Sequence, residues 1–221
     1  MKVLFSEARK RIELRKNEIG HITKKLPEKL GILASLQYIN IIPYLKKELE
    51  KRNKTVLLSS GRLTKYAGQV IGCDVFSALN IKHADAFLLI GSGKFHALQV
   101  ALETKKPVFI WQPGTEIARI KKEDIKNFEN KRKTALIKFL NANEAGILVS
   151  IKPGQYKLNE ALSLRKKLKK KNFIFLFDTL NLAEIENFSC QSWINTACPN
   201  IILDDTRILN IKEIRKISSK P

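Results

Sequence analysis

The chain has 221 residues, of which 44% are hydrophobic, enough for one large or two small globular domains. It contains no run of 18 apolar residues, no secretory signal pattern and only three cysteines, which argues against a membrane span, export and a disulfide framework and predicts a cytosolic (cytoplasmic) protein. The net charge is +20, but the basic residues are spread along the chain rather than gathered beside aromatics, so solvated helix faces are favoured over a nucleic-acid groove.

The first half of the chain begins with a charged segment. Residues 1–25 carry only scattered apolar positions, which indicates an N-terminal helix or linker that connects rather than packs. Residues 26–115 then show short apolar runs separated by turn residues and one amphipathic helix with Ile39, Ile42, Leu45 and Leu49, typical of an α/β domain. The predicted strands are Gly31–Ser35, Thr55–Leu58, Ala86–Ile90 and Pro107–Trp111.

The second half repeats this organisation. Gly146–Ser150 matches Gly31–Ser35 almost letter for letter. A basic helix over Leu158–Lys171 and further strands follow in the same order as before, which predicts two homologous parallel α/β domains, 26–115 and 144–221, joined by a charged connecting helix over 116–143. The predicted strands after the helix are Phe173–Phe177, Trp193–Ala197 and Ile201–Leu203.

Two cysteines close turn-rich motifs that follow predicted strands. Cys73 ends the stretch Gly68–Cys73, and Cys198 precedes Pro199, which has no N–H for a strand ladder. Cys198 should therefore project from the carboxyl end of a strand, the edge where open α/β sheets bind ligands. Each of the two is a candidate metal ligand or nucleophile, or else a small buried hydrophobe. Cys190 should lie roughly 20 Å from that edge at about 3.3 Å per residue, and we expect it to be structural.

Loops at the carboxyl ends of predicted strands define a candidate cleft between the two domains. In the first domain Gly91-Ser92-Gly93 offers backbone N–H groups at a helix start, suited to a carboxylate or phosphate, unless the glycines only permit a tight turn. His96 on that loop is either a core or capping histidine or part of the site. The loops that we expect to meet are Ser59–Cys73, Gly91–His96, Ser150–Gln155 and Cys198–Asn200.

Four motifs in one order carry a family resemblance: Gly68–Asp74, Ile90–Leu98, Ser150–Gln155 and Trp193–Pro199. Together they resemble the archaeal diphthamide synthase family, 2-(3-amino-3-carboxypropyl)histidine synthase. The resemblance implies three repeated α/β domains, each giving one cysteine to a 4Fe-4S cluster. It also implies that S-adenosylmethionine binds the open iron and is cleaved to a 3-amino-3-carboxypropyl radical, which alkylates a histidine of translation elongation factor two.

The resemblance also assigns residues, although none as catalytic. It implies that Cys73 and Cys198 are two of the three cluster ligands, since thiolates are the usual ligands of such clusters. Backbone N–H groups, an amide and a point charge suit the cofactor. The residues expected to bind it are Gly91, Ser92, Gly93, His96, Ser150, Lys152 and Gln155.

The family's first domain, with its cysteine, has no counterpart in this sequence. We therefore expect a separate chain to supply the third thiolate, in an assembled unit that forms dimers as in the family. The alternatives are an inactive scaffold, a basic module that binds RNA or the ribosome, and a zinc site made by Cys73, Cys198 and His96. Zinc accepts sulfur and nitrogen ligands, but no paired C-x-x-C spacing supports that site.

Overall fold

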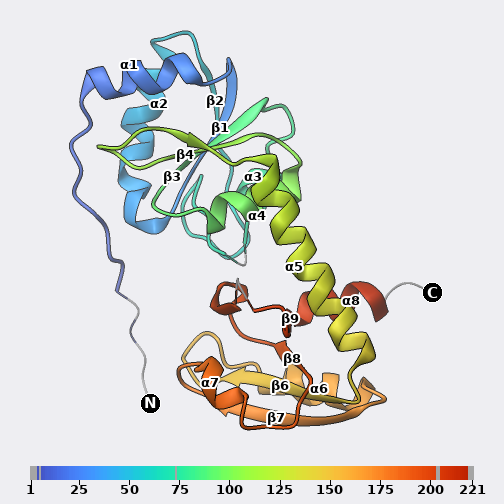
Figure 1. Cartoon of the computed structure of the whole chain (residues 1–221). Coiled ribbons are helices and arrows are strands. Elements are labelled where there is room, and N and C mark those ends of the chain that lie inside the picture. The colour runs from blue at the N-terminus through green and yellow to red at the C-terminus, as the bar shows by residue number, and fades with distance from the viewer. Residues whose placement is uncertain (1–3, 5, 73, 203–204, 219–221) are drawn as a thin grey trace. The chain divides into compact units, whose positions relative to one another are not determined.

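The computed structural model describes residue 4 and residues 6–72, 74–202 and 205–218. The chain divides into two compact units, Met1–Ile125 and Lys126–Pro221 (Figure 1). Helix α5 (Lys122–Asn141) runs across the division between them. Each unit has its own sheet and its own buried clusters of apolar side chains.

The first unit is built on a five-stranded sheet in the order β2-β1-β3-β4-β5. Its first four strands are parallel, and the short β5 pairs with β4 in the antiparallel direction. The strands are β1 (Lys29–Ala34), β2 (Thr55–Leu57), β3 (Ala86–Ile90), β4 (Val108–Trp111) and β5 (Ala118–Arg119). The helices are α1 (Lys16–Lys25), the 3-10 helix η1 (Leu36–Ile41), α2 (Ile42–Glu50), α3 (Phe76–Leu79) and α4 (Phe95–Thr104).

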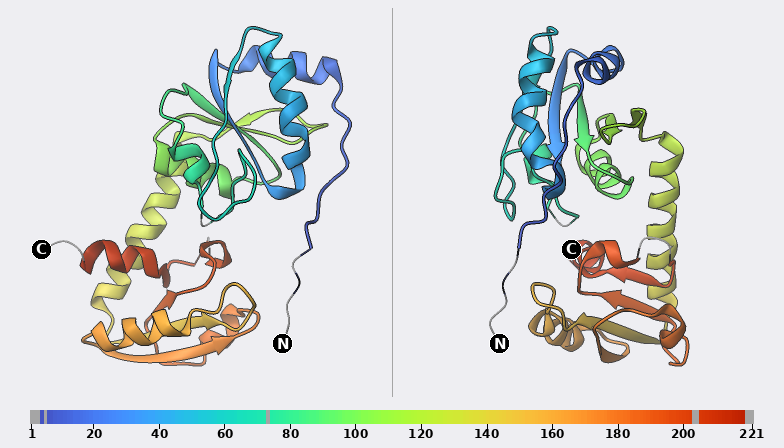
Figure 2. Two further views of the ribbon diagram at one scale, coloured as in Figure 1. Left: turned by 180° about the vertical axis from the view of Figure 1, so that it is seen from behind. Right: turned by 90° about the vertical axis from the view of Figure 1, so that its left-hand side faces the viewer.

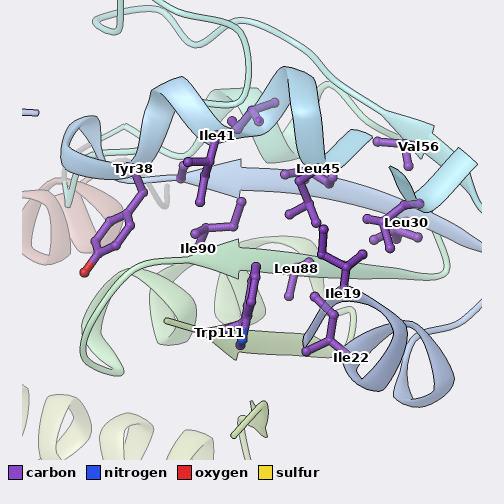
Figure 3. Close-up of a cluster of buried hydrophobic side chains, with 14 of the residues drawn as sticks. Ile19, Ile22, Leu30, Tyr38, Ile41, Leu45, Val56, Leu88, Ile90 and Trp111 are labelled. Atoms are coloured by element: carbon purple, nitrogen blue, oxygen red, sulfur yellow. The ribbon is translucent and has the colours of Figure 1, made fainter. Parts of the chain in front are cut away.

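Helices cover both faces of the first sheet. On one face α1, η1 and α2 pack against the strands, and Leu45 and Leu88 belong to the same buried cluster (Figure 3). On the other face α3 and α4 pack, and Phe87 and Val100 share a second cluster. The right-hand view of Figure 2 shows α2 and α4 on opposite sides of the strands. Burial on both faces explains why β1 and β3 are continuous apolar runs rather than alternating ones.

The second unit has a four-stranded, fully parallel sheet in the order β7-β6-β8-β9. Its strands are β6 (Glu144–Ser150), β7 (Lys171–Phe177), β8 (Ser192–Asn195) and β9 (Ile208–Asn210). Its further helices are α6 (Leu158–Lys167), α7 (Leu182–Ile185), the 3-10 helix η2 (Pro199–Ile202) and α8 (Ile211–Ser218). The fold is therefore two repeated parallel-sheet α/β units, as the sequence predicts.

The internal repeat extends to strand register. In both units the first strand lies between the second and third, and the fourth follows the third. Gly31 of β1 is paired in register with Phe87 of β3, and Gly146 of β6 is paired with Trp193 of β8. The repeated glycine thus lies beside an aromatic residue of the third strand in each unit.

The N-terminal segment differs from the connecting helix or linker that we expected over residues 1–25. A helix is present only from Lys16, and the preceding described residues have no regular secondary structure. Ile19 and Ile22 of α1 are buried in the core of the first unit, with Ile12 packed against the same cluster. Scattered apolar residues among many charges were thus enough for this segment to pack.

Two predicted elements are corrected by the structure. The connecting helix begins at Lys122 rather than near residue 116, because β5 occupies part of that stretch and pairs with β4. The strand predicted at Ile201–Leu203 is wrong for its described residues, since Pro199–Ile202 form η2 and the fourth strand is β9. Pro199 cannot donate to a sheet ladder, and the Ile201 N–H bonds back to the Cys198 carbonyl at 3.2 Å.

No helix among the described residues combines the length and the apolar character needed to cross a bilayer.

Candidate functional site

The loop between β2 and α3 returns to the carboxyl end of β1. The Ala34 N–H bonds to the Gly68 carbonyl at 2.8 Å, and the Val70 N–H bonds to the Ala34 carbonyl at 2.9 Å. Gln69 therefore lies at the edge of the sheet where the sequence places its motif. Cys73, the predicted cluster ligand four residues further on, lies outside the described residues.

Asp74 organises the backbone on the far side of Cys73. Its buried carboxylate accepts hydrogen bonds from the N–H groups of Leu63 at 2.5 Å and Phe76 at 2.9 Å. Ile71 and Asp74 also exchange two backbone hydrogen bonds, at 3.2 and 3.0 Å. The role of Asp74 was not predicted from the sequence, although aspartate side chains often accept a hydrogen bond from the backbone N–H two residues further on.

The Gly91–His96 loop meets the same edge of the first unit. Gly91 follows β3, and its N–H bonds to the Trp111 carbonyl at 3.0 Å. A Cβ placed on Gly72 would come within 2.5 Å of the Phe95 ring, so the residue that precedes Cys73 lies against the start of α4. The structure thus brings together, within the first unit, two of the loops that the sequence predicted to meet.

The start of α4 follows an exposed, glycine-containing turn. Ser92 and Gly93 are exposed, and Gly93 has a φ of +85°, a conformation that favours glycine. The N-cap residue is Lys94, whose side chain has no acceptor for the N–H groups of the helix and whose ammonium group donates to the Asp124 carboxylate at 3.2 Å. Burial lowers the pKa of the half-buried His96 imidazole, which favours its neutral form.

Ser150 and Lys152 form the equivalent loop at the carboxyl end of β6. Ser150 is fully buried, and its hydroxyl accepts a hydrogen bond from the Lys152 N–H at 3.2 Å. The Lys152 side chain is exposed, with its ammonium group 3.5 Å from the Thr179 hydroxyl. Ser150 therefore shapes the turn, while Lys152 presents a positive charge; their contacts with a cofactor stay predictions.

The side-chain oxygen of Gln155, in the same loop, is buried without a hydrogen-bond partner in the described part of the chain. Buried amide oxygens are nearly always bonded in native structures, so such an atom calls for an explanation. A ligand ammonium or N–H group would satisfy it, in keeping with the predicted cofactor role.

Cys198 lies in a turn that Asn195 holds in shape. The buried Asn195 side chain donates to the Cys198 carbonyl at 3.0 Å and accepts from the Ala197 N–H at 2.9 Å. Thr196 anchors the same turn to β6, because its N–H and its hydroxyl both bond to the Leu148 carbonyl, at 3.1 and 2.8 Å. Cys198 is half-buried and follows the end of β8, which confirms its predicted place at the carboxyl edge. The roles of Asn195 and Thr196 were not predicted from the sequence.

Cys190 lies at the other end of β8 and has a different environment. It packs against a buried cluster that includes Trp193. Burial, followed by the charge of Glu144, raises the pKa of the Cys190 thiol, which disfavours the thiolate that a metal needs. The position fits the structural role predicted for this residue.

No three or more His, Cys, Asp or Glu side chains gather in the described part of the chain in a way that could hold a metal ion. The cluster and zinc hypotheses both include Cys73, so neither is decided by the described residues alone. The meeting of Cys73 and Cys198 in one cleft remains a prediction.

Comparisons with known proteins agree on one family. The family model of diphthamide synthesis proteins matches residues 1–213. The chain is 33% identical over 198 residues to a 2-(3-amino-3-carboxypropyl)histidine synthase of Pyrococcus horikoshii, covering 88% of the chain and 56% of the relative. It is 28% identical over 184 residues to the synthase of Methanocaldococcus jannaschii, covering 80% and 47%. The chain thus spans about half the length of the curated relatives that it matches.

Solved structures are similar as well. The crystal structure of Dph2 from Pyrococcus horikoshii superposes with a TM-score of 0.79 at 31% identity, covering 92% of this chain and 61% of that one. The structure of the same protein with a 4Fe-4S cluster gives a TM-score of 0.78 at 31% identity, covering 91% and 60%.

Proposed function

Because the chain belongs to the diphthamide synthesis protein family, we propose that it carries two of the three α/β domains of a 2-(3-amino-3-carboxypropyl)histidine synthase. In this proposal the assembled enzyme is cytoplasmic and acts in diphthamide biosynthesis. It cleaves S-adenosylmethionine and transfers the 3-amino-3-carboxypropyl group to a histidine of translation elongation factor two.

The observation that carries the proposal is the turn that presents Cys198. Cys198 is half-buried at the carboxyl edge of the second sheet, and its backbone carbonyl is bonded to the Asn195 side chain. The chain is also similar to a Dph2 structure that contains a 4Fe-4S cluster. A thiol on a preorganised turn at a sheet edge suits a cluster ligand, since a ligand must reach the metal from a fixed backbone.

Cys73 is the second ligand in this proposal, and the third thiolate comes from outside these 221 residues. We assign that thiolate to a separate chain that carries the family's first domain, and the assembled unit forms a dimer. When bound, a 4Fe-4S cluster with three thiolate ligands supplies one open iron for the amino and carboxylate groups of S-adenosylmethionine and the electron for its cleavage.

The other residues of the two edges orient S-adenosylmethionine. The buried Oε1 of Gln155, which has no partner in the described part of the chain, accepts a hydrogen bond from its amino group. The backbone N–H groups at the start of α4, after Gly91-Ser92-Gly93, bind an anionic group such as its carboxylate. Lys152 adds a positive charge at the edge of the second sheet. The half-buried His96 lies at the edge of the first sheet, and its neutral form does not repel the positively charged sulfonium group of S-adenosylmethionine.

Anaerobic reconstitution with iron and sulfide tests the proposal. The chain is mixed with a partner that carries a lone α/β domain and one cysteine, and the visible absorbance and iron content are measured. Cys198→Ala and Cys73→Ala should each lose most of the cluster, whereas Cys190→Ala, the matched control in the same chain, should retain it. Absence of a cluster in the wild-type mixture would sink the proposal, and bound zinc in place of iron would favour the zinc alternative.

The net charge of +20 favours an alternative, a basic module that binds RNA or the ribosome. This alternative predicts a different result. Its affinity for nucleic acid would fall steeply with salt and would survive replacement of Cys73 and Cys198.

A further inference from the structure

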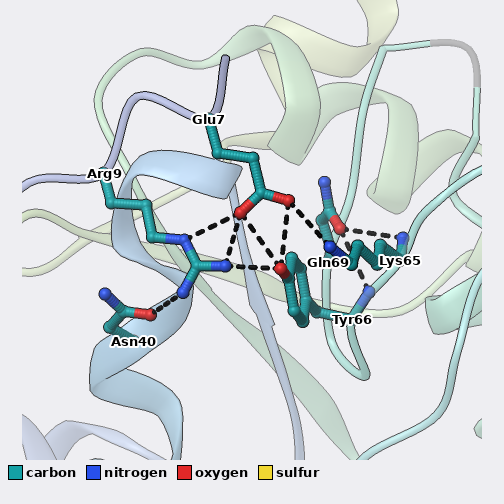
Figure 4. Close-up of polar contacts among 6 residues, drawn as sticks. All are labelled: Glu7, Arg9, Asn40, Lys65, Tyr66 and Gln69. Atoms are coloured by element: carbon teal, nitrogen blue, oxygen red, sulfur yellow. Dashed lines mark hydrogen bonds and ion pairs between the residues drawn. The ribbon is translucent and has the colours of Figure 1, made fainter. Parts of the chain in front are cut away.

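The N-terminal segment is fastened to the loop that precedes Cys73 (Figure 4). Both carboxylate oxygens of Glu7 accept hydrogen bonds from the Tyr66 hydroxyl at 3.0 Å, and one lies 3.3 Å from the Lys65 ammonium group. Arg9 donates to the Glu7 carboxylate at 3.0 and 2.5 Å and to the Tyr66 hydroxyl at 2.5 Å. We call residues 7–14 the strap.

The strap is also tied to the body of the first unit. Arg9 donates to the Asn40 side chain at 2.5 Å, and the Lys10 N–H bonds to the Gln37 carbonyl at 2.9 Å. Ile12 and Leu14, further along the strap, pack against the buried cluster that contains α1 and α2. The strap therefore links the Lys65–Tyr66 turn to the buried core of the first unit.

The Lys65–Tyr66 turn is hydrogen-bonded to Gln69, which lies close to Cys73 in the sequence. The Gln69 Oε1 atom accepts hydrogen bonds from the N–H groups of Lys65 at 3.1 Å and Tyr66 at 3.2 Å. The Gln69 carbonyl accepts one from the Ser77 hydroxyl at 3.0 Å, on the other side of Cys73 in the sequence. A displacement of Tyr66 should therefore reach the backbone on both sides of Cys73.

We propose that Glu7 and Arg9 are positioning residues for the Cys73 loop. The inference rests on the proposed function, in which Cys73 is a cluster ligand. The two side chains are about one-third exposed, at 35% and 32%, and ion pairs at such sites add little to global stability. Their effect should instead fall on local opening of the loop that they fasten.

The test compares the thiols within one chain. In the cluster-free protein, the rate of iodoacetamide alkylation of Cys73 is divided by the rate for Cys198, and amide exchange of residues 61–72 is followed in parallel. Glu7→Ala and Tyr66→Phe should change the alkylation ratio roughly three- to ten-fold and speed the exchange, because the described residues that lead to Cys73 open more often. Glu116→Ala should change neither, since it removes another exposed carboxylate of the first unit, paired with Lys25 at 2.9 Å.

An unchanged ratio in both variants would overturn the inference, even if amide exchange became faster, because the strap would then be merely structural. An equal change of the ratio in Glu116→Ala would overturn it too, since the effect would then be global. Neither measurement needs a cluster, so failure of this inference is distinguishable from failure of the reconstitution experiment.

Discussion

Gly146 on β6 lies directly against the indole ring of Trp193 on β8, and a Cβ placed on Gly146 would come within 2.2 Å of two ring carbons. The first unit repeats this relationship, because a Cβ on Gly31 would lie 2.5 Å from the Phe87 ring. In both units an aromatic side chain of the third strand lies over the first strand where there is no side chain. The repeated glycine is therefore a packing requirement.

Gly146→Ala is expected to destabilise the second unit. The added methyl group must displace a buried ring or the strand itself, and such overpacking costs about 1–3 kcal/mol. Urea unfolding followed by circular dichroism measures the change. Gly20→Ala in α1 is the matched control, since nothing lies within 4 Å of its added Cβ and alanine favours a helix. Equal midpoints for Gly146→Ala and the wild type would contradict the close packing.

Asn195→Ala is expected to loosen the turn that presents Cys198. The change leaves the buried Ala197 N–H and the Cys198 carbonyl without the side chain that now bonds both, at a cost of about 1–3 kcal/mol. Cluster content after reconstitution should fall, and iron analysis measures it. Asn181→Ala, which removes a side-chain bond to the Ala183 N–H at the exposed start of α7, should retain the cluster. Full cluster content in Asn195→Ala would show that this turn needs no such support.

Gln155→Leu should weaken S-adenosylmethionine binding without harming the fold. Loss of one hydrogen bond of about 1.4 kcal/mol corresponds to a roughly ten-fold weaker affinity, which calorimetry on the assembled enzyme can measure. Thermal unfolding should be unchanged or slightly improved, because the buried Oε1 has no partner among the described residues.

Gln191→Leu provides the opposite pattern. The Gln191 Oε1 atom accepts a hydrogen bond from the Asn143 N–H at 2.7 Å, so its removal should lower stability and spare S-adenosylmethionine binding. If the two variants behaved alike, the unpaired oxygen of Gln155 would have no special role.

The first unit should lose stability in acid through Glu48. Hydrogen bonds from Lys51 and then Arg52 lower the pKa of the Glu48 carboxyl from 4.5 to about 2. The unfolded chain therefore binds the proton more readily, and the contribution of this group is complete above pH 4.5 and is lost as the pH falls towards 2. Urea unfolding of the wild type and Glu48→Gln across this range measures the effect. The glutamine variant should show a flatter pH dependence, and parallel curves would refute the assignment.

The sequence alone determined the α/β class, the repeat and most strand positions. Strands buried on both faces must be continuous apolar runs, so Ala86–Ile90 and Gly146–Ser150 could be read directly. The place of Cys198 also followed from local chemistry, since Pro199 cannot continue a strand ladder, although β8 itself ends earlier than predicted, at Asn195.

Only the tertiary structure decided which side chains support the candidate site. Glu7 bonds to Tyr66, 59 positions along the chain, and nothing in either local pattern indicates this contact. The loops that hold Gly72 and Phe95 were expected to meet, but the packing of the Phe95 ring against Gly72 was not predicted. The fourth strand of the second unit was misplaced for the same reason, because a short apolar run becomes a strand only where a neighbour pairs with it. Local propensity and periodicity act over a few residues, whereas hydrogen-bond partners and close packing depend on groups that folding brings together from distant parts of the chain.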